Sequence, residues 1–290
     1  MIDYIFHNIC RLLSLIKGIV KSFCISDSIK SITNISDNII IIGNGPSLTT
    51  SVNRYLKKLQ ENDCMVVNQF ADTDLYEIIK PRYYVLSDPV YLTPYSDLFP
   101  DLRIKVQRLV HNINNKTAWK LMIILASKAR NSCFVKDLSE NNNIEFAYYN
   151  DSGPSDFKIN KVRFYLWARN MLSPLGFTVL NTALSIAITL KIKNIYLIGA
   201  DTSWHENFRI DQDTNELYIE DTHFYGKPSR MKLYLDQNRR FPSKVYQELR
   251  SVSVTLESYW ILKAYAEYCN INVYNASEYS WIDAFKRVKL

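Results

Sequence analysis

The sequence is poor in glycine and histidine and has no paired cysteines. Of 290 residues, 7 are glycine, 4 are histidine and 5 are scattered cysteines. Without paired cysteine spacing, the chain has neither a disulfide framework nor a zinc site of the usual kind, which favours a reducing compartment. The scarcity of histidine also leaves few candidates for a general base near neutral pH.

Long apolar runs and strong charge are missing as well. No apolar run is long enough to span a bilayer, and the sequence has no signal peptide with a cleavage site and no internal repeat. The net charge of +6 suits an anionic ligand or a membrane surface, but it is too mild to predict a nucleic-acid partner. The length suffices for one large α/β domain. We expect a cytoplasmic protein, peripheral at the inner membrane face if the amino-terminal segment binds lipid.

What is present is a strand, a glycine turn and a helix start near residue 40. The isoleucines at 39–42 predict a strand buried on both faces, and Ser47 is a candidate cap for the helix that follows. Backbone N–H groups at such a turn favour a nucleotide phosphate, and glycine lets a ligand approach closely. An ordinary strand-to-helix turn is an equal alternative, because Gly-x-Gly is a weak signal. The turn consists of Gly43, Asn44, Gly45 and Pro46.

Polar residues follow two further predicted strands. Residues 63–67 predict a strand that runs into Asn68 and Gln69, and residues 83–86 predict another that runs into Ser87 and Asp88. Ligands of open α/β sheets bind at the carboxyl ends of the strands, so we expect these side chains at a nucleotide site. The alternative for Asn68 is that its amide satisfies loop backbone.

A helix and a strand make up the second strong signal, at residues 176–201. The helix begins near Thr178, whose hydroxyl is a candidate donor to an anion, and it contains Asn181. The strand over 195–198 ends in Gly199-Ala200-Asp201, which places Asp201 at the same sheet edge. We also expect a helix over 251–268 and a last strand over 271–275.

Three stretches give weaker predictions. Residues 120–135 predict a helix that runs into a strand at 132–135. Residues 137–165 are polar and aromatic without a clear period, which indicates a lid or insertion. Residues 280–290 predict a short helix.

The fold class is therefore α/β: a Rossmann-like, mostly parallel sheet flanked by helices, a variant of the GT-A type, with a small lid. We divide the chain into an amphipathic helix and linker (1–37), a nucleotide-binding core (38–201), a lid or insertion (202–250) and a carboxyl-terminal helix and strand that complete the core (251–290). Residues 1–24 predict a helix with a broad apolar face and a basic side. This helix lies in a membrane interface, or it packs on the domain or on a partner subunit, which leaves a homo-oligomer open.

Candidate catalytic groups lie after the Gly-x-Asp strand. His205 and His223 are the candidate bases there, although a loop histidine is more often an ordinary surface residue. The acids Asp201, Glu206, Asp211 and Asp213 are loosely spread, so they allow a metal there without requiring one.

The two blocks resemble the family 42 bacterial sialyltransferases, of the GT42 type. The resemblance rests on Gly43 to Leu48, on Val67 to Phe70, on Ala183 to Ala187 with Ile195 to Asp201, and on Thr222 to Gly226. It covers roughly residues 38–90 and 176–276, in the same order and spacing. It implies a donor of CMP-linked acid sugar, a glycan or lipid-linked acceptor, inversion at the sugar, and no metal or other cofactor.

The resemblance also implies roles for single residues. His223 is the base, Asn44 and Asn68 contact the nucleotide, and Thr178 or Asn181 lies near its ribose or phosphate. Ser87-Asp88-Pro89 falls where the family has a turn that contacts the donor. The family's two phosphate-binding tyrosines have no counterpart in the matching stretch, so we expect replacement by Ser203, His205 or Arg209. The sugar is therefore sialic acid or another CMP-linked acid sugar.

Two other interpretations stay open. The same loop and the Gly-x-Asp pairing resemble pterin diphosphokinase-like proteins of the DUF115 type, which would use ATP and magnesium and depend on Asp88 and Asp201. A non-catalytic nucleotide-binding partner of a glycan-assembly complex would keep the loop and tolerate loss of His223. Metal dependence separates the first from a sialyltransferase-like enzyme, and turnover excludes the second.

Overall fold

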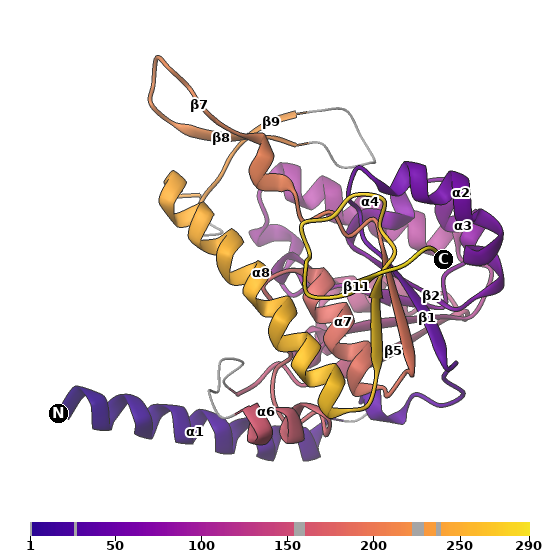
Figure 1. The fold of residues 1–290 in the computed structure, drawn as a ribbon, viewed down its shortest axis with the longest axis horizontal. Coiled ribbons are helices and arrows are strands. Elements are labelled where there is room, and N and C mark those ends of the chain that lie inside the picture. The colour runs from indigo at the N-terminus through magenta and orange to yellow at the C-terminus, as the bar shows by residue number, and fades with distance from the viewer. Residues whose placement is uncertain (1, 26–27, 154–159, 222–228, 236–238) are drawn as a thin grey trace.

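A parallel sheet is the centre of the computed structural model, which describes residues 2–25, 28–153, 160–221, 229–235 and 239–290 (Figure 1). Its eight strands all run parallel, and their carboxyl ends meet at one edge. In spatial order the strands are β11 (Lys286–Arg287), β10 (Asn272–Asn275), β6 (Asn194–Ile198), β1 (Asn38–Ile42), β2 (Cys64–Val67), β3 (Tyr83–Val85), β4 (Leu121–Ala126) and β5 (Ile144–Tyr149). This is the predicted Rossmann-like α/β class.

Helices cover both faces of the sheet, as a fully parallel sheet requires. One hydrophobic cluster lies between the sheet and helices α6, α7 and α8, and a second lies between the sheet and α2 to α5. The helices are α1 (Ile2–Cys24), α2 (Leu48–Glu61), α3 (Leu75–Ile79), α4 (Pro100–Lys116), α5 (Cys133–Leu138), α6 (Asn160–Trp167), α7 (Val179–Thr189) and α8 (Val245–Tyr268).

Strand β1 shows why an unbroken isoleucine run becomes a central strand. Side chains alternate across a strand, so Ile39 and Ile41 enter the cluster under α7 and α8, and Ile40 and Ile42 enter the cluster under α2. All four are buried. A strand with one polar face would leave one of the two helix layers without apolar contacts.

The chain changes direction at β1. From β1 it builds β2, β3, β4 and β5 outward on one side, and it then returns to place β6 on the other side of β1. Ile42 is paired with Val66 of β2 and with Ile198 of β6. Such a topological switch point opens a crevice at the carboxyl ends of the strands, where ligands of open α/β sheets bind.

A second, antiparallel sheet lies beyond that edge. It consists of β7 (Phe208–Ile210), β8 (Leu217–Asp221) and β9 (Ser229–Lys232), in that order. Figure 1 shows it projecting from the main sheet near the first turns of α8. It therefore belongs to the part of the chain, residues 202–250, in which we expected a lid.

The local predictions were right for most buried elements. The strands predicted at 39–42, 63–67, 83–86, 195–198 and 271–275 and the helices at 1–24, 178–190 and 251–268 are confirmed within a few residues. The prediction for residues 120–135 is wrong in order: the stretch begins with strand β4 and ends in helix α5. A short apolar run buried on both faces has no period that separates strand from helix.

Two predictions for polar stretches are also wrong. Residues 137–165 contain edge strand β5 and the first turns of α6 rather than only an insertion, although residues 154–159 lie outside the described part. Residues 280–290 form no helix but carry β11, which pairs with β10. Strand β11 is short and exposed, so it carries no apolar pattern, whereas β5 is mostly apolar and buried and its pattern was not recognised.

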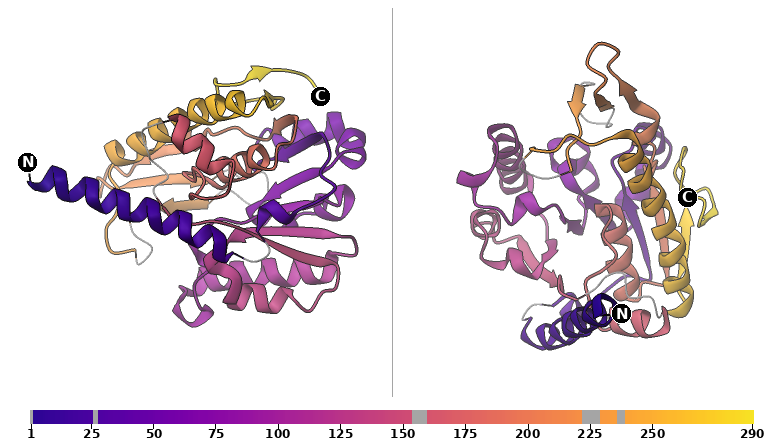
Figure 2. Two further views of the ribbon diagram at one scale, coloured as in Figure 1. Left: turned by 90° about the horizontal axis from the view of Figure 1, so that it is seen from below. Right: turned by 90° about the vertical axis from the view of Figure 1, so that its left-hand side faces the viewer.

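Helix α1 lies against the molecule with its carboxyl-terminal half and projects with its amino-terminal half (Figures 1 and 2). Leu15 and Ile19 pack on the hydrophobic cluster beneath α6 and α7. In the described residues, no helix reaches the length and mean hydropathy that crossing a bilayer requires.

Candidate functional site

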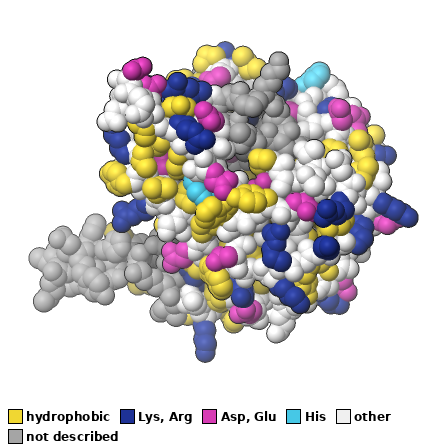
Figure 3. All heavy atoms as spheres, turned by 45° about the horizontal axis from the view of Figure 1, so that its top comes forward, with side chains coloured by type: hydrophobic (Ala, Val, Ile, Leu, Met, Phe, Trp, Pro, Cys, Tyr) yellow, Lys and Arg dark blue, Asp and Glu magenta, His cyan; other side chains and the backbone are white. Residues whose placement is uncertain are grey.

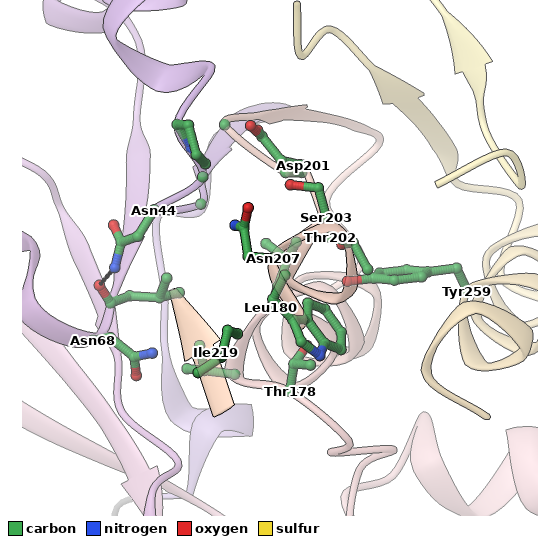
Figure 4. A pocket seen from close by; sticks show the side chains of 18 of the residues that line it. Asn44, Asn68, Thr178, Leu180, Asp201, Thr202, Ser203, Asn207, Ile219 and Tyr259 are labelled. Carbon is green, nitrogen blue, oxygen red and sulfur yellow. Dashed lines mark hydrogen bonds between the residues drawn. The ribbon is translucent and has the colours of Figure 1, made fainter. Parts of the chain in front are cut away.

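A cavity of about 320 Å³ opens at the topological switch point. The ends of β1, β2 and β6, the first turn of α7, residues of β8 and one side chain of α8 surround it (Figure 4). Its volume is in the range of small-molecule sites. The lining consists of Gly43, Asn44, Gly45, Pro46, Val67, Asn68, Thr178, Val179, Leu180, Gly199, Ala200, Asp201, Thr202, Ser203, Trp204, Asn207, Ile219, Glu220 and Tyr259.

The glycines at the strand ends allow the chain to pack against itself. The Gly43 N–H donates to the Ile198 carbonyl at 2.8 Å, and the Gly45 N–H donates to the Gly199 carbonyl at 2.9 Å. A Cβ at Gly43 would lie 2.4 Å from the Gly199 oxygen, and a Cβ at Gly45 would lie 2.3 Å from the Asp201 carboxylate. We predicted room for a ligand beside Gly43 and Gly45, but on their Cβ sides the strand β6 and its continuation fill that room.

The carboxylate of Asp201 is bound at the start of α2. It accepts hydrogen bonds from the Ser47 N–H at 2.8 Å and the Ser47 hydroxyl at 2.6 Å. Burial raises the pKa of Asp201 above its ordinary value, while both Ser47 hydrogen bonds act in the opposite direction. Ser47 occupies the cap position, but the prediction that its side chain caps the helix is wrong, because its hydroxyl donates to Asp201. The protein's own anion thus lies at this helix start.

The start of α7 is capped without a charge. Thr178 and Asn181 form a reciprocal capping box: the Asn181 N–H donates to the Thr178 hydroxyl at 3.3 Å, and the Thr178 N–H donates to the Asn181 amide oxygen at 3.1 Å. The next two N–H groups, of Val179 and Leu180, donate no hydrogen bond within the described residues, and both residues line the cavity. The positive end of α7 therefore faces the cavity.

Three hydroxyl groups gather beside the start of α7. Tyr259 is almost fully buried, and its hydroxyl lies near those of Thr178 and Thr202 but makes no hydrogen bond within the described residues. Burial raises the pKa of Tyr259 to about 12, so its hydroxyl is protonated near neutral pH and can donate. Thr202 has a φ of +52°, which is strained for a β-branched residue, and such strain is concentrated at functional sites. Figure 4 shows Tyr259 pointing from α8 toward Thr202.

Amide side chains lie on the opposite wall. The Asn44 amide donates to the Val67 carbonyl at 3.0 Å, which ties the first loop to the end of β2. Asn68 adopts a φ of +50°, and its own carbonyl accepts from the Tyr84 hydroxyl. Asparagine tolerates a positive φ better than most residues, so the backbone conformation favours asparagine at position 68 even without a ligand. In Figure 4, Asn207 points into the space between these residues and Tyr259.

Eight of the sequence-predicted residues line the cavity, and the following residues do not. The Gln69 amide is buried against the Tyr91 hydroxyl at 3.2 Å. Asp88 caps a short 3₁₀ turn by accepting from the Val90 N–H at 3.0 Å, and Ser87 precedes it outside the lining. Ser47 and Asn181 act through the hydrogen bonds described above. The cavity residues are Gly43, Asn44, Gly45, Pro46, Asn68, Thr178, Asp201 and Ser203.

The proposed replacements for the phosphate-binding tyrosines lie on the rim. The His205 ring packs edge-on against Trp281 at 4.5 Å between centroids, and Arg209 donates to the carbonyls of Glu206 and Phe208. Neither side chain lines the cavity. Ser203 does line it, which makes it the one member of that set inside. The predicted base His223 lies outside the described residues.

Acidic residues near the cavity are spread apart. The described part of the chain holds no cluster of three or more histidine, cysteine or acidic side chains suited to a metal ion. Asp211 instead pairs with Arg230, which holds the pKa of that carboxyl well below its ordinary value. On the face seen in Figure 3, basic and acidic side chains are interspersed among uncharged and apolar ones.

Thr202, Asn207 and Tyr259 line the cavity but were not among the predicted site residues. Asn207 lies in the stretch that resembles the family, so its place after the Gly-x-Asp strand could be read from the sequence. The direction of its side chain could not. Tyr259 sits in a 24-residue helix among other aromatic residues, and no sequence signal separates it from them. Which of these tyrosines reaches the site depends on how α8 packs.

Fold and site define an α/β protein with a ligand cavity at the switch point of a parallel sheet. No protein-family model and no curated protein matches the chain. Among solved structures it is similar to the MAf glycosyltransferase from Magnetospirillum magneticum AMB-1, with 15% identity, a TM-score of 0.49 and coverage of 89% of this chain. The chain spans about a third (34%) of that structure's length. At this TM-score the likeness carries no conclusion about family or activity.

Proposed function

We propose that the protein is a glycosyltransferase that moves an acid sugar from a CMP-activated donor to a glycan acceptor. The observation that supports this best is the cavity at the switch point, where the uncharged start of α7 and three hydroxyl groups meet. Together they offer a phosphate several donors without a competing carboxylate at the same helix start.

The donor's phosphate binds at α7 in this proposal. The N–H groups of Val179 and Leu180 supply the backbone donors, and the hydroxyls of Thr178, Thr202 and Tyr259 supply the side-chain donors. Asn44, Asn68 and Asn207 face the nucleoside, because an amide can both donate to and accept from a base or ribose. Tyr259 and Thr202 thus take the place that we first assigned to His205 and Arg209.

The reaction inverts the sugar centre and needs no metal. A base takes the proton from the acceptor hydroxyl, the new C–O bond forms to the anomeric carbon, and the bond from that carbon to the phosphate oxygen breaks. CMP leaves with the electron pair, so donors that strengthen as its charge grows lower the barrier. His223 as the base is carried over from the family resemblance.

Calorimetric titration tests the binding half of the proposal. CMP should bind in EDTA, and UMP, GMP and ATP should bind more weakly. Tyr259→Phe should lower the CMP affinity about tenfold, since a hydrogen bond to a charged group is worth roughly 1.5–3 kcal/mol. Tyr265→Phe is the matched control, because this tyrosine lies on the same helix but its hydroxyl contacts Thr189.

Turnover of CMP-linked sugars tests the proposed transfer reaction and the role of its base. Release of CMP from CMP-sialic acid, lost in His223→Ala with CMP binding retained, would support the enzyme and the base together. ATP binding that requires magnesium would favour the pterin diphosphokinase-like alternative. CMP binding without turnover of any CMP-linked acid sugar would favour the non-catalytic partner of a glycan-assembly complex.

A further inference from the structure

Helix α1 has two distinct sides. On one side its carboxyl-terminal half is anchored: the Asn150 amide donates to the Gly18 carbonyl at 2.7 Å, and Lys21 pairs with Asp151 at 2.6 Å. Gly18 allows a close approach there, because a Cβ would lie 3.0 Å from the Met171 carbonyl oxygen, which is a tight contact. These contacts hold the helix in one orientation on the molecule.

The other side of α1 is apolar and exposed. Its side chains recur at intervals of one, three and four residues, which places them on one stripe of the helix. Each is between 49% and 77% exposed, although large apolar side chains are usually covered when they gather in a stripe. The stripe consists of Ile9, Leu12, Leu13, Ile16, Val20 and Phe23.

Charge indicates what covers this stripe. The sequence of α1 contains Arg11, Lys17 and Lys21 but a single acid, Asp3, near its start. Lys21 is already paired with Asp151, but pairing of two copies through the stripe would bring the remaining positive charges of α1 together without acidic partners on the helix, which is unfavourable. An anionic lipid surface accepts both the apolar stripe and the exposed Lys17 at its border.

The neighbouring surface continues the pattern. Figures 1 and 2 place α6 beside α1 on the same side of the molecule. Val162 and Tyr165 of α6 are exposed, Lys161 is exposed next to them, and the Arg169 guanidinium lies 3.6 Å from the centroid of the Tyr165 ring. Tyrosine and long basic side chains suit the headgroup region, where one end is apolar and the other is wet.

We propose that the exposed face of α1, with the adjoining face of α6, lies in the interface of an anionic lipid bilayer and holds the protein there. Binding combines burial of the six apolar side chains with attraction of the basic ones to the lipid headgroups. The helix stays in the plane of the interface, because its carboxyl-terminal half remains anchored to the folded domain.

Sedimentation of the 290-residue protein with large unilamellar vesicles tests the proposal. The wild type should bind vesicles that contain phosphatidylglycerol and bind phosphatidylcholine vesicles more weakly. The triple variant L12S/L13S/I16S should bind anionic vesicles at least tenfold more weakly, because three buried side chains are lost. Lys17→Gln should weaken binding about fivefold, and 1 M NaCl should reduce the preference for anionic lipid.

Matched controls keep the test decisive. Y246S/L249S removes equally exposed apolar side chains from α8, and Lys57→Gln removes an exposed charge from α2; both should bind like the wild type. Far-UV circular dichroism and CMP titration report whether each variant is folded, independently of lipid. Wild-type binding by the triple variant would overturn the proposal, as would a dimer that dissociates in the triple variant while the wild type ignores vesicles.

Discussion

Helices α2 and α7 both begin at the edge of the sheet that carries the cavity, but only α2 has a carboxylate of the protein bound at its start. At α2 the chain supplies its own anion, because Asp201 accepts both the N–H and the hydroxyl of Ser47. At α7 the cap is the uncharged pair Thr178 and Asn181. Each helix start carries a partial positive charge, so the first is compensated internally and the second is left for a ligand.

At α2, a sequence pattern that is typical of phosphate binding serves to hold the protein's own carboxylate. The loop from Gly43 to Ser47 looks like the stronger anion site in the sequence, yet its helix start binds a carboxylate 154 residues away in the chain. The start of α7 at Thr178 has a weaker sequence signal, yet it faces the cavity and has the hydroxyl of Tyr259 nearby.

The largest effect is expected from Gly43→Ala. The added methyl would lie 2.4 Å from the Gly199 oxygen, so β1 and β6 must separate, and Asp201 must move away from Ser47. We expect a loss of about 3 kcal/mol in the free energy of unfolding, measured by urea denaturation. Thr49→Ala on the exposed first turn of α2 is the control, and a loss below about 1 kcal/mol in Gly43→Ala would contradict the tight strand contact.

An intermediate effect distinguishes the two helix starts directly. Ser47→Ala and Thr178→Ala should each cost about 1 kcal/mol in stability, because each removes one hydrogen-bonding hydroxyl at a helix start. Only Thr178→Ala should also lower the affinity for CMP, by about tenfold, in calorimetric titration. Equal losses of CMP affinity in both variants would place the phosphate at α2 and overturn the comparison.

The smallest effect concerns the pH dependence of stability. Burial raises the pKa of Asp201 in the folded protein above its ordinary 3.8, so the folded state holds this proton more tightly than the unfolded state. Its contribution to stability is therefore fully present below pH 3.8 and is lost as the pH rises through the raised pKa. Urea denaturation across that window should show a smaller decline with pH in Asp201→Asn, and an identical slope would contradict it.

Much of the fold could be predicted because its strongest signals are local. The isoleucines of β1, the apolar strand β6 and the small-residue helix α7 carry their patterns within a few residues. The location of the ligand cavity could be predicted from these strands, because ligands bind where parallel strands end and the strand order reverses. Strand β11 could not be predicted, because its two residues are exposed and only its pairing with β10 makes it a strand. Strand β5 is apolar, but the polar residues around it hid its pattern.

The candidate site divides in the same way. Asn44, Asn68, Thr178 and Asp201 could be placed at the cavity because each directly follows or precedes a strongly patterned element. Gln69 and Asp88 also follow strands, but their side chains point away from the cavity and bond to the Tyr91 hydroxyl and the Val90 N–H, respectively. Sequence position places a backbone at the edge, but side-chain direction depends on the nearest partner.

By itself the sequence determined which segments become buried strands and helices, since burial of apolar side chains follows from their spacing along the chain. It also determined that polar residues end those strands. The contact of Asp201 with the start of α2 and the approach of Tyr259 to α7 follow from the packing of the elements, because both join residues far apart in the sequence. Such contacts depend on how the elements pack, and packing involves the whole chain at once.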